Sequence, residues 1–373
     1  MSLFSIVVKN LLRRPVRSLL TLVGIAIGIG AVVALTSLAW GFERTWTNTY
    51  RARGADLIVA KITSRDPLPT PFPSTAVAEM ARLEGVQAAA GVMSDVMSIE
   101  DSPVMLVVAW QLDTFIWDHL RLRQGRLPRD DSESVVVLGE IAAELLHKSV
   151  GDRLQIETEE SIVSAIVSSA ALAENGAVIL SLGRLQALTG RPGMVSYANL
   201  KLDPALTPEA IRALRRTIEA LPGGFKAFDA TEVGQANLAV QAGKAMSLAT
   251  SLIAIAIGVV GVANTVLMSV FERVYEIGIL LALGWRRSRI ILMIMIESLL
   301  LSLVGGLAGI ACGTLALQVL QQLPWFRGRI EMAVTLAPLG AAILVSLALG
   351  VLGGVYPAWR GAHMQPTAAL RHE

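Results

Sequence analysis

The chain has 373 residues, and its 32 Lys and Arg residues nearly balance its 30 Asp and Glu residues, which gives a net charge of +2. This balance does not favour a nucleic-acid-binding protein, which carries a clustered basic surface. Only 17% of the residues are charged, 53% are apolar and the mean hydropathy is +0.58, so the chain is too apolar for an ordinary soluble domain. The composition predicts that part of the chain lies in a lipid bilayer.

Four long apolar segments predict four transmembrane helices. About 20 apolar residues, at a rise of ~1.5 Å per residue, span a hydrocarbon core of ~30 Å. The chain contains four such runs, of which only the third contains a charged residue, Glu297: residues 18–40, 245–271, 290–320 and 336–359. A secretory signal also begins with basic residues before an apolar run, but its apolar core has only ~7–15 residues and ends at small residues. Because the first run is longer and ends at Trp40, we expect a retained membrane anchor.

The basic residues predict how the helices are oriented. They precede the first run, lie between the second and third, and follow the fourth, and such residues accumulate on the cytoplasmic side of membranes. They are Lys9, Arg13, Arg14, Arg17, Arg273, Arg286, Arg287, Arg289, Arg360 and Arg371. We therefore expect residues 272–289 and both termini in the cytoplasm and residues 41–244 and 321–335 outside, although Arg327 and Arg329 oppose the rule.

The two termini are predicted to be cytoplasmic segments of different kinds. Residues 1–17 have an apolar and a basic helical face, which is typical of an amphipathic elbow helix lying in the membrane interface. The alternative is that these residues merely flank the first span. Residues 360–373 form a short cytoplasmic tail.

Residues 41–244 are predicted to form an extracytoplasmic α+β domain. The β-like runs are 56–60, 104–109, 134–138, 153–156, 162–168, 177–180 and 198–202, and the helical stretches are 74–83, 141–147 and 208–220. The domain contains no cysteine, so no disulfide bond stabilises it. Helical spacing continues from Trp40 to Tyr50 and also precedes the second span from Val233 to Gly243, which predicts a two-helix stalk. The predicted fold class is thus a four-span α-helical transmembrane domain plus this stalked domain.

Small and charged residues within the spans indicate how the helices pack. Glycines four residues apart allow close helix contact in lipid, and they occur at Gly24, Gly28, Gly305, Gly309, Gly313, Gly350 and Gly354. Glu297 is costly to place in lipid, which favours a functional role. The alternative is that Glu297 reaches the cytoplasmic edge, about two turns away near Arg289.

The loop from Phe271 to Ile290 has charged ends and an apolar middle. Its sequence is FERVYEIGILLALGWRRSRI, and the apolar middle comprises Ile277, Ile279, Leu280, Leu281 and Leu283. A short amphipathic helix ending at Gly284 would bury this middle in a groove of a partner protein. A plain basic loop would explain the arginines but not the apolar middle.

The sequence predicts no catalytic site, metal site or cofactor in this chain. The four histidines are dispersed, no cysteine or histidine pair has metal-ligand spacing, and G-x-S-x-G is absent. The phosphate-binding motif G-x-x-x-x-G-K-[ST] is also absent, so we expect ATP hydrolysis, if any, in another chain.

One span, a large outer domain and three further spans resemble the MacB/FtsX-type permeases of ABC transporters, the type VII ABC transporter superfamily. The resemblance covers essentially the whole chain. It is strongest in KNLLRRPVRSLLTLVGIAIGIGAVV (9–33), ERVYEIGILLALG (272–284), ESLLLSLVGGLAGIACG (297–313) and GGVYPAWRGAHMQPTAALR (353–371). The segment LRLRQGRLPRDDSESVVVLGEIAAEL (120–145) resembles the MacB-like porter and sabre region, and the similarity is weaker between residues 157 and 230.

The resemblance implies a coupling helix that docks a cytoplasmic ATPase. The residues that match this motif are Glu272, Arg273, Glu276, Ile277, Gly278, Leu283 and Gly284, and Arg286 at the rim completes the predicted docking surface. Trp285 stands where the family usually has a small residue. The resemblance further implies a homodimer in the lipid of the bacterial cytoplasmic membrane, two ATPase subunits that bind ATP and Mg, and room for a periplasmic adaptor.

Two functions remain open, because one architecture serves several functions. The favoured one is a mechanotransmission-type exporter or extractor of an amphiphilic lipid, lipoprotein, haem, peptide or drug. The alternative is a non-transporting mechanotransmitter that activates a cell-wall hydrolase or sensor, as FtsX-type proteins do. A stand-alone membrane enzyme is a third class, disfavoured because no nucleophile and base pair is visible.

Overall fold

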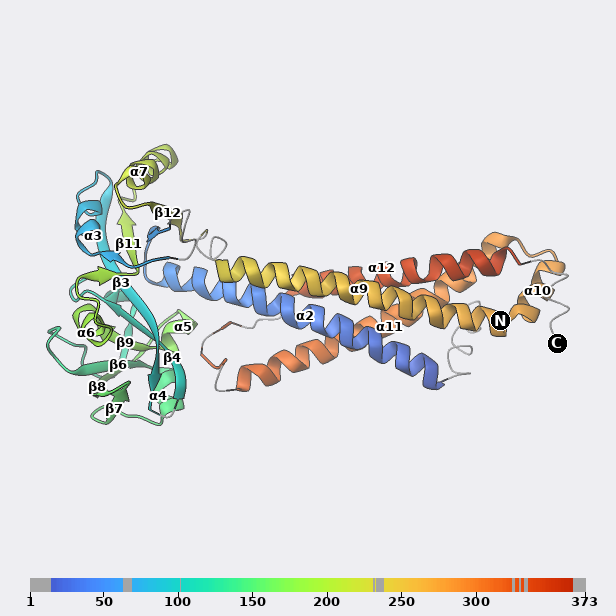
Figure 1. Cartoon of the computed structure of the whole chain (residues 1–373), viewed down its shortest axis with the longest axis horizontal. Helices are drawn as coiled ribbons and strands as arrows, with labels where there is room; N and C mark the ends of the chain where they lie inside the picture. Colours follow the sequence, from blue (N-terminus) through green and yellow to red (C-terminus); the bar gives the residue numbers. More distant parts are fainter. Residues whose placement is uncertain are drawn as a thin grey trace. The chain divides into compact units, whose positions relative to one another are not determined.

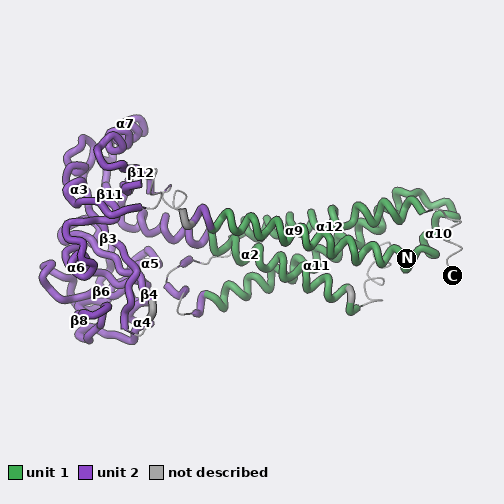
Figure 2. The backbone as a smooth tube through the Cα atoms, viewed as in Figure 1, with its two compact units in different colours: residues 1–39, 243–320, 332–373 green, residues 40–242, 321–331 purple. Residues whose placement is uncertain are grey.

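The computed structural model describes residues 15–62, 69–100, 102–230, 232, 238–323, 326–328, 330–331 and 335–364. The chain divides into two compact units (Figure 2): residues 1–39, 243–320 and 332–373 form unit 1, and residues 40–242 and 321–331 form unit 2. Most of the predicted elbow, residues 365–373 of the predicted tail, and Val233 and Ala236 of the second predicted stalk helix lie outside the described residues.

Four long apolar helices carry the membrane-spanning part (Figure 1): α2 (Pro15–Ala52), α9 (Leu238–Glu272), α11 (Arg287–Gln322) and α12 (Leu336–Ala362). Each is long and apolar enough to cross a membrane, so the predicted four spans are confirmed. Helix α2 continues beyond the predicted span as far as Ala52, as the helical spacing after Trp40 indicated.

Helix α11 makes the closest contacts within unit 1. Half of the residues in its most apolar stretch are buried, against 33% or less in the other three helices. Three contacts with α2 follow one another along both helices in the same direction: Ile25–Gly305, Ile29–Gly309 and Val33–Gly313. The two helices therefore run parallel, and a Cβ atom added at Gly313 would lie 2.7 Å from the carbonyl oxygen of Gly30.

Serine and glycine join α11 to α12. Three contacts run in opposite directions along the two helices, which are therefore antiparallel: Ser298–Gly354, Ser302–Gly350 and Gly306–Ser346. The Ser298 hydroxyl also donates a hydrogen bond to the carbonyl oxygen of Gly350 (2.8 Å). Because a Cβ at any of these glycines would overlap the facing serine, only glycine permits this approach.

Two of the seven predicted packing glycines lack such contacts. A Cβ atom at Gly28 would make an ordinary contact, 3.5 Å from the Cβ of Ala254, and at Gly24 it would meet nothing within 4 Å. Among the described residues of this chain, Gly24 therefore has no close neighbour, and its predicted role in helix packing stays a prediction. Spacing of four residues does not say which side of a helix faces its neighbour, and the side of α2 that contacts α11 carries Ile25 and Gly30.

Unit 2 contains a mixed ten-stranded sheet in the order β12-β1-β11-β3-β4-β9-β6-β8-β5, with β7 pairing β3 and β8. Its strands are β1 (Leu57–Lys61), β3 (Val86–Ile99), β4 (Ser102–Trp110), β5 (Arg121–Gly125), β6 (Val135–Gly139), β7 (Arg153–Ile156), β8 (Glu159–Ser168), β9 (Val178–Ser181), β11 (Tyr197–Leu202) and β12 (Phe225–Asp229). The pairs β4–β9 and β6–β8 are parallel and the other pairs are antiparallel. Two short strands, β2 (Phe72–Pro73) and β10 (Met194–Val195), pair separately.

The two faces of the sheet have separate apolar cores. Along β4, Val107 packs into the core on one face and Val108 into the core on the other, as strand alternation requires. The first core is shared with α3 (Thr75–Met80), α4 (Glu140–Leu146), α6 (Leu182–Leu188) and α7 (Pro208–Ala220). The second is shared with Tyr50 of α2 and Trp117 of the 3₁₀ helix η1 (Trp117–His119). The predicted α+β domain is confirmed.

Three strands of the ten-stranded sheet, as well as the short strands β2 and β10, were not predicted from the sequence. β3 contains three alanines and Gly91, residues with low strand preference, yet it lies in the sheet between β11 and β4. Every residue of β5 is exposed, so no hydrophobic alternation marks it. β12 is a short strand at the other edge. Sheet pairing, and not local preference, orders these segments.

A buried ion pair ties the end of α2 to the sheet domain. Arg53, the residue after α2, donates from Nε to Glu174 Oε1 (2.7 Å), and both side chains are 1% exposed. Glu174 lies in α5 (Leu172–Asn175) and also accepts hydrogen bonds from His119 Nε2 (2.5 Å) and the Ser169 hydroxyl (2.7 Å). The guanidinium of Arg53 stacks over the ring of Trp110, 5.0 Å from its centroid. Burial alone raises the pKa of Glu174, but Arg53 and His119 together lower it to about 2.

We expect acid to destabilise unit 2 through Glu174. Between its ordinary pKa of 4.5 and its folded value of about 2, the carboxyl is ionised in the folded state and protonated in the unfolded state, so stability is lost as pH falls through this window. The ionised form contributes about 3 kcal/mol, at ~1.4 kcal/mol per pKa unit. Urea unfolding of the full chain in detergent, monitored by hydrogen exchange of the sheet amides at pH 7, 4.5 and 3, measures this. Glu174→Gln should be less stable at pH 7 and less sensitive to acid, whereas exposed Glu84→Gln should match the original chain. Equal acid sensitivity of all three proteins would contradict the assignment.

Candidate functional site at the corner between α9 and α11

The short helix predicted between the second and third spans is present. Helix α9 ends at Glu272, Arg273 leaves helical geometry, and α10 runs from Val274 to Ala282. Gly284 has a φ of +86°, and its N–H donates to the Leu281 carbonyl while the Trp285 N–H donates to that of Leu280. This is the Schellman arrangement, which favours glycine at the left-handed position and ends the helix where the sequence predicted.

Helix α10 presents an apolar stripe to the surroundings. Tyr275, Ile279 and Leu283, four residues apart, are 55%, 38% and 74% exposed. Because residues four apart lie on one helical face, they form a continuous strip, which we call the α10 stripe. The exposed side chains of Glu272 and Glu276 belong to the same corner. Sequence reasoning included Ile279 and Leu283 in the apolar middle but missed Tyr275, whose exposure follows only from the orientation of the helix.

The eight predicted docking residues divide into two groups. Five are exposed: Glu272, Glu276, Leu283, Gly284 and Arg286. Three are buried: Arg273, Ile277 and Gly278. Ile277 belongs to the apolar core of unit 1, so it and Gly278 hold the helix against the bundle and do not face outward. The structure therefore does not support direct contact of these three buried residues with a docked partner.

Glu297, the acidic residue within the third span, is paired. Its Oε2 accepts a hydrogen bond from Arg273 Nη1 (2.9 Å), its Oε1 accepts one from the Ser269 hydroxyl (2.7 Å), and its side chain is 6% exposed. The carboxylate is therefore held by Arg273, a residue of the predicted cytoplasmic segment. The ion pair joins the first residue of the α10 corner to the N-terminal third of α11. Sequence reasoning missed the pair because 24 residues separate its members and no periodicity links them.

The ion pair also fixes the direction in which α10 leaves α9. The Nε atom of Arg273 lies 3.7 Å from the Glu276 carboxylate, one turn into α10, so one guanidinium contacts both α10 and α11. At the other end of α10, the guanidinium of Arg289 lies 5.9 Å from the ring of Trp285. Trp285 therefore contacts the first turn of α11.

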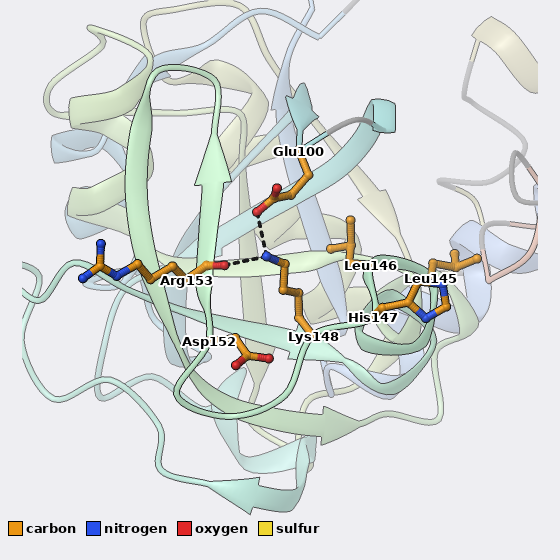
Figure 3. Close-up of a pocket in the computed structure, with 7 residues that line it drawn as sticks. All are labelled: Glu100, Leu145, Leu146, His147, Lys148, Asp152 and Arg153. Atoms are coloured by element: carbon orange, nitrogen blue, oxygen red, sulfur yellow. Dashed lines mark hydrogen bonds and ion pairs between the residues drawn. The ribbon is translucent and has the colours of Figure 1, made fainter.

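Within the described residues, no group of three or more His, Cys, Asp or Glu side chains could hold a metal ion. An open hollow of about 760 Å³ in unit 2 is lined by Glu100, Leu145, Leu146, His147, Lys148, Asp152 and Arg153 (Figure 3). Its ammonium group, on Lys148, already binds the Glu100 carboxylate (3.0 Å) and the Arg153 carbonyl oxygen (2.7 Å). The ammonium group of Lys148 is thus already bound by groups of the chain itself.

Comparison with known proteins matches both parts of the chain. A model described as "MacB-like periplasmic core domain" matches residues 18–217, and one described as "FtsX-like permease C-terminal" matches residues 248–366. An uncharacterized ABC transporter permease of Methanocaldococcus jannaschii is 24% identical over 98% of this chain and 96% of its own length. The macrolide export ATP-binding/permease protein MacB of Nitrobacter winogradskyi is 27% identical over 95% of this chain, which spans only 58% of that protein. The periplasmic region of MacB from Actinobacillus actinomycetemcomitans aligns with a TM-score of 0.41 at 15% identity, over 50% of this chain and 94% of its own.

We expect that replacing one member of the Arg273–Glu297 pair destabilises unit 1 more than replacing both members. Glu297→Leu leaves the Arg273 guanidinium buried without its partner and should cost about 3–5 kcal/mol, whereas the double variant Arg273→Met, Glu297→Leu should recover most of this loss. Thermal unfolding in lipid nanodiscs measures the stability, and hydrogen exchange of the α10 amides measures the local effect. The matched control is Arg286→Met, because Arg286 is exposed. A double variant that is no more stable than Glu297→Leu would contradict the pairing.

Proposed function

Because the chain belongs to the family of MacB- and FtsX-type permeases of ABC transporters, we propose that it is the permease of an exporter or extractor of an amphiphilic substrate. The substrate classes that suit this function are a lipid, a lipoprotein, haem, a peptide or a drug. A separate ATPase supplies the energy: two ATPase subunits, each with ATP and Mg, dock on a homodimer of this chain. A periplasmic adaptor is a further proposed partner.

The observation that carries this proposal is the α10 stripe. It is an apolar surface on a short helix outside the long spans, and Arg273 fixes the start of that helix to Glu297 of α11. A surface of this kind suits a hydrophobic groove on a partner protein, with Glu272, Glu276 and Arg286 at its rim. Because the ion pair makes α10 and α11 one mechanical part, a partner that moves α10 also moves α11.

Export is favoured over signalling by the comparisons. The match to the MacB-like core covers most of the predicted outer domain, and the Nitrobacter relative carries the name of a macrolide export protein. The alternative is a non-transporting mechanotransmitter that activates a cell-wall hydrolase or sensor. In that case the variants below change cell-wall hydrolysis or signalling, and sensitivity to amphiphiles stays constant.

Mechanical transmission is supported by the continuity of α2. This helix runs without a break from Pro15 to Ala52, and the next residue, Arg53, is held by Glu174 in unit 2. A long helix that is fixed at its end can transmit displacement and rotation. We therefore propose that ATP-driven movement reaches the sheet domain through α2.

We expect a charge in the α10 stripe to uncouple the ATPase. Ile279→Asp or Leu283→Asp places a carboxylate in the proposed groove contact, where its desolvation is unfavourable. Copurification of the ATPase and ATP hydrolysis in proteoliposomes should both fall by about tenfold or more, as a loss of ~1.4 kcal/mol or more in binding requires.

The matched control for this experiment is Ser288→Glu. Ser288 is an exposed residue in the first turn of α11, in the same predicted cytoplasmic segment, so the variant adds a negative charge outside the stripe. Unchanged ATPase binding by both stripe variants would show that α10 is not the docking helix.

We expect a change of helical register in α2 to separate ATP hydrolysis from output. Two alanines inserted between Ala39 and Trp40 keep the helix but turn every later residue by about 200°, at ~100° per residue. ATP hydrolysis in proteoliposomes should continue, whereas the resistance of cells to a panel of amphiphilic antibiotics and detergents should fall to that of a deletion strain.

The control insertion places two alanines between Asp131 and Ser132, in the exposed loop that joins β5 to β6. It should leave both hydrolysis and resistance intact. Transmission through α2 is wrong if the α2 insertion leaves resistance intact, or if it abolishes hydrolysis together with resistance.

A further inference from the structure

The loop that joins α11 to α12 is bound to the last turns of α2. The carboxylate of Glu331 accepts hydrogen bonds from Asn48 Nδ2, 3.0 Å from each oxygen. The N–H of Glu331 donates to Thr45 Oγ1 (2.8 Å), whose hydroxyl donates in turn to the Gly41 carbonyl (2.8 Å). A Cβ atom at Gly41 would overlap the Glu331 carbonyl oxygen, so the loop backbone lies directly against the helix.

The same loop is bound to the sheet domain a few residues earlier. Gly328 has a φ of +75° and packs against Gly176, where a Cβ atom would overlap the Gly328 carbonyl oxygen. A Cβ atom at Gly328 would lie 2.7 Å from Ile141 Cγ2. Arg327 also forms an ion pair with Glu144 (2.7 Å), but both side chains are half exposed or more, so this pair adds little. Glycine at 176 and 328 is what permits the approach of the two backbones.

These contacts connect three parts of unit 2 with one another: the end of α2, the loop and the short segment 174–176. Gly176 follows Glu174 by two residues, and Glu174 binds Arg53 at the end of α2. The Gly176 N–H donates to the Leu172 carbonyl, so α5 holds residues 174 and 176 as one turn. Segment 174–176 is thus bound both by α2, through Arg53, and by the loop, through Gly328. The loop is in turn bound to α2 through Glu331.

We propose that the described loop residues 326–328 and 330–331 form a strap that locks α2 to segment 174–176. Only Ala177 separates this segment from β9, which pairs with β4 and β6 inside the sheet, so a displacement of the segment reaches the central strands. The contacts of the strap are hydrogen bonds, an ion pair and glycine packing, which can break and re-form without disturbing an apolar core. The strap contacts the sheet domain directly, so the loop after α11 provides a second connection to the sheet in addition to α2. The use of this connection in export rests on the proposed function, but the lock itself does not.

If the strap locks the two parts together, weakening its contact with Gly176 should also weaken its contact with α2. In full-length protein with Cys312→Ser, the pair Asn48→Cys and Glu331→Cys places two thiols on side chains that contact each other, and it leaves the hydrogen bond between the Glu331 N–H and the Thr45 hydroxyl in place. Mild oxidation in nanodiscs should join them. Adding Gly176→Ala places a methyl group against Gly328, at the other end of the strap, and should lower the cross-linking yield by about fivefold or more.

The control for the added methyl group is Gly261→Ala, because a Cβ atom at Gly261 meets nothing within 4 Å. This change should leave the yield intact. An equal yield with and without Gly176→Ala would overturn the strap, because its two contacts would then be independent.

A second measurement keeps the proposal testable if Gly176→Ala does not fold. In the double-cysteine protein, hydrogen exchange of the Gly176 and Ala177 amides should slow about fivefold or more when the disulfide forms. Equal exchange in the oxidised and reduced protein would overturn the strap. Neither measurement needs the ATPase, so failure of the strap is distinguishable from failure of the proposed export function.

Discussion

The arrangement of the spans depends on the close approach of α11 to its neighbours. Lipid tails are as apolar as the side chains of the helices, so moving these side chains from lipid into a helix interface gives no hydrophobic gain. Helices in lipid therefore associate through close packing and hydrogen bonds. One side of α11 presents Gly305, Gly309 and Gly313 to α2. Another presents Ser298, Ser302 and Gly306 to α12, with glycine opposite each serine and serine opposite the glycine. These contacts leave no room for a single added methyl group, so α2, α11 and α12 are held in one register.

Two buried ion pairs add direction to this packing. Arg53 is the first residue after α2 and Arg273 is the first residue after α9, and each binds a buried glutamate from another segment. Compared with two packed apolar side chains, an intact buried pair contributes little to stability, because its attraction is offset by the loss of hydration, but a pair that has lost one partner is costly. Each pair therefore disfavours any conformation in which the arginine at the end of the long helix is separated from its glutamate. At both places the chain leaves a long helix in a defined direction.

The spans and most of the sheet strands could be predicted from sequence because each depends on a local property, hydropathy or alternation. β3 could not, because its Ala and Gly residues are ordered by strands β4 and β11 on either side. The glycine spacing identified Gly305, Gly309 and Gly313, which contact α2, but not which helix each row contacts, since spacing defines a row on the helix and not the neighbour of that row. At the candidate site, the short helix and its end at Gly284 follow from sequence. The burial of Ile277 and the Arg273–Glu297 pair do not, because both depend on tertiary packing in the core of unit 1.

The kinds of contact in the molecule also indicate where it can change shape. Apolar cores interdigitate at high density and do not deform continuously, so the two faces of the sheet and the row of small residues along α11 behave as rigid parts. Within unit 2, local contacts connect the end of α2, the loop before α12 and segment 174–176: Glu174 with Arg53, Glu331 with Asn48, and Gly328 against Gly176. Each has a defined geometry and can break without exposing an apolar core. We therefore expect a displacement of α2 within unit 2 to be accommodated at these contacts, so that their geometry, and not the strength of the apolar cores, determines how the displacement reaches the sheet.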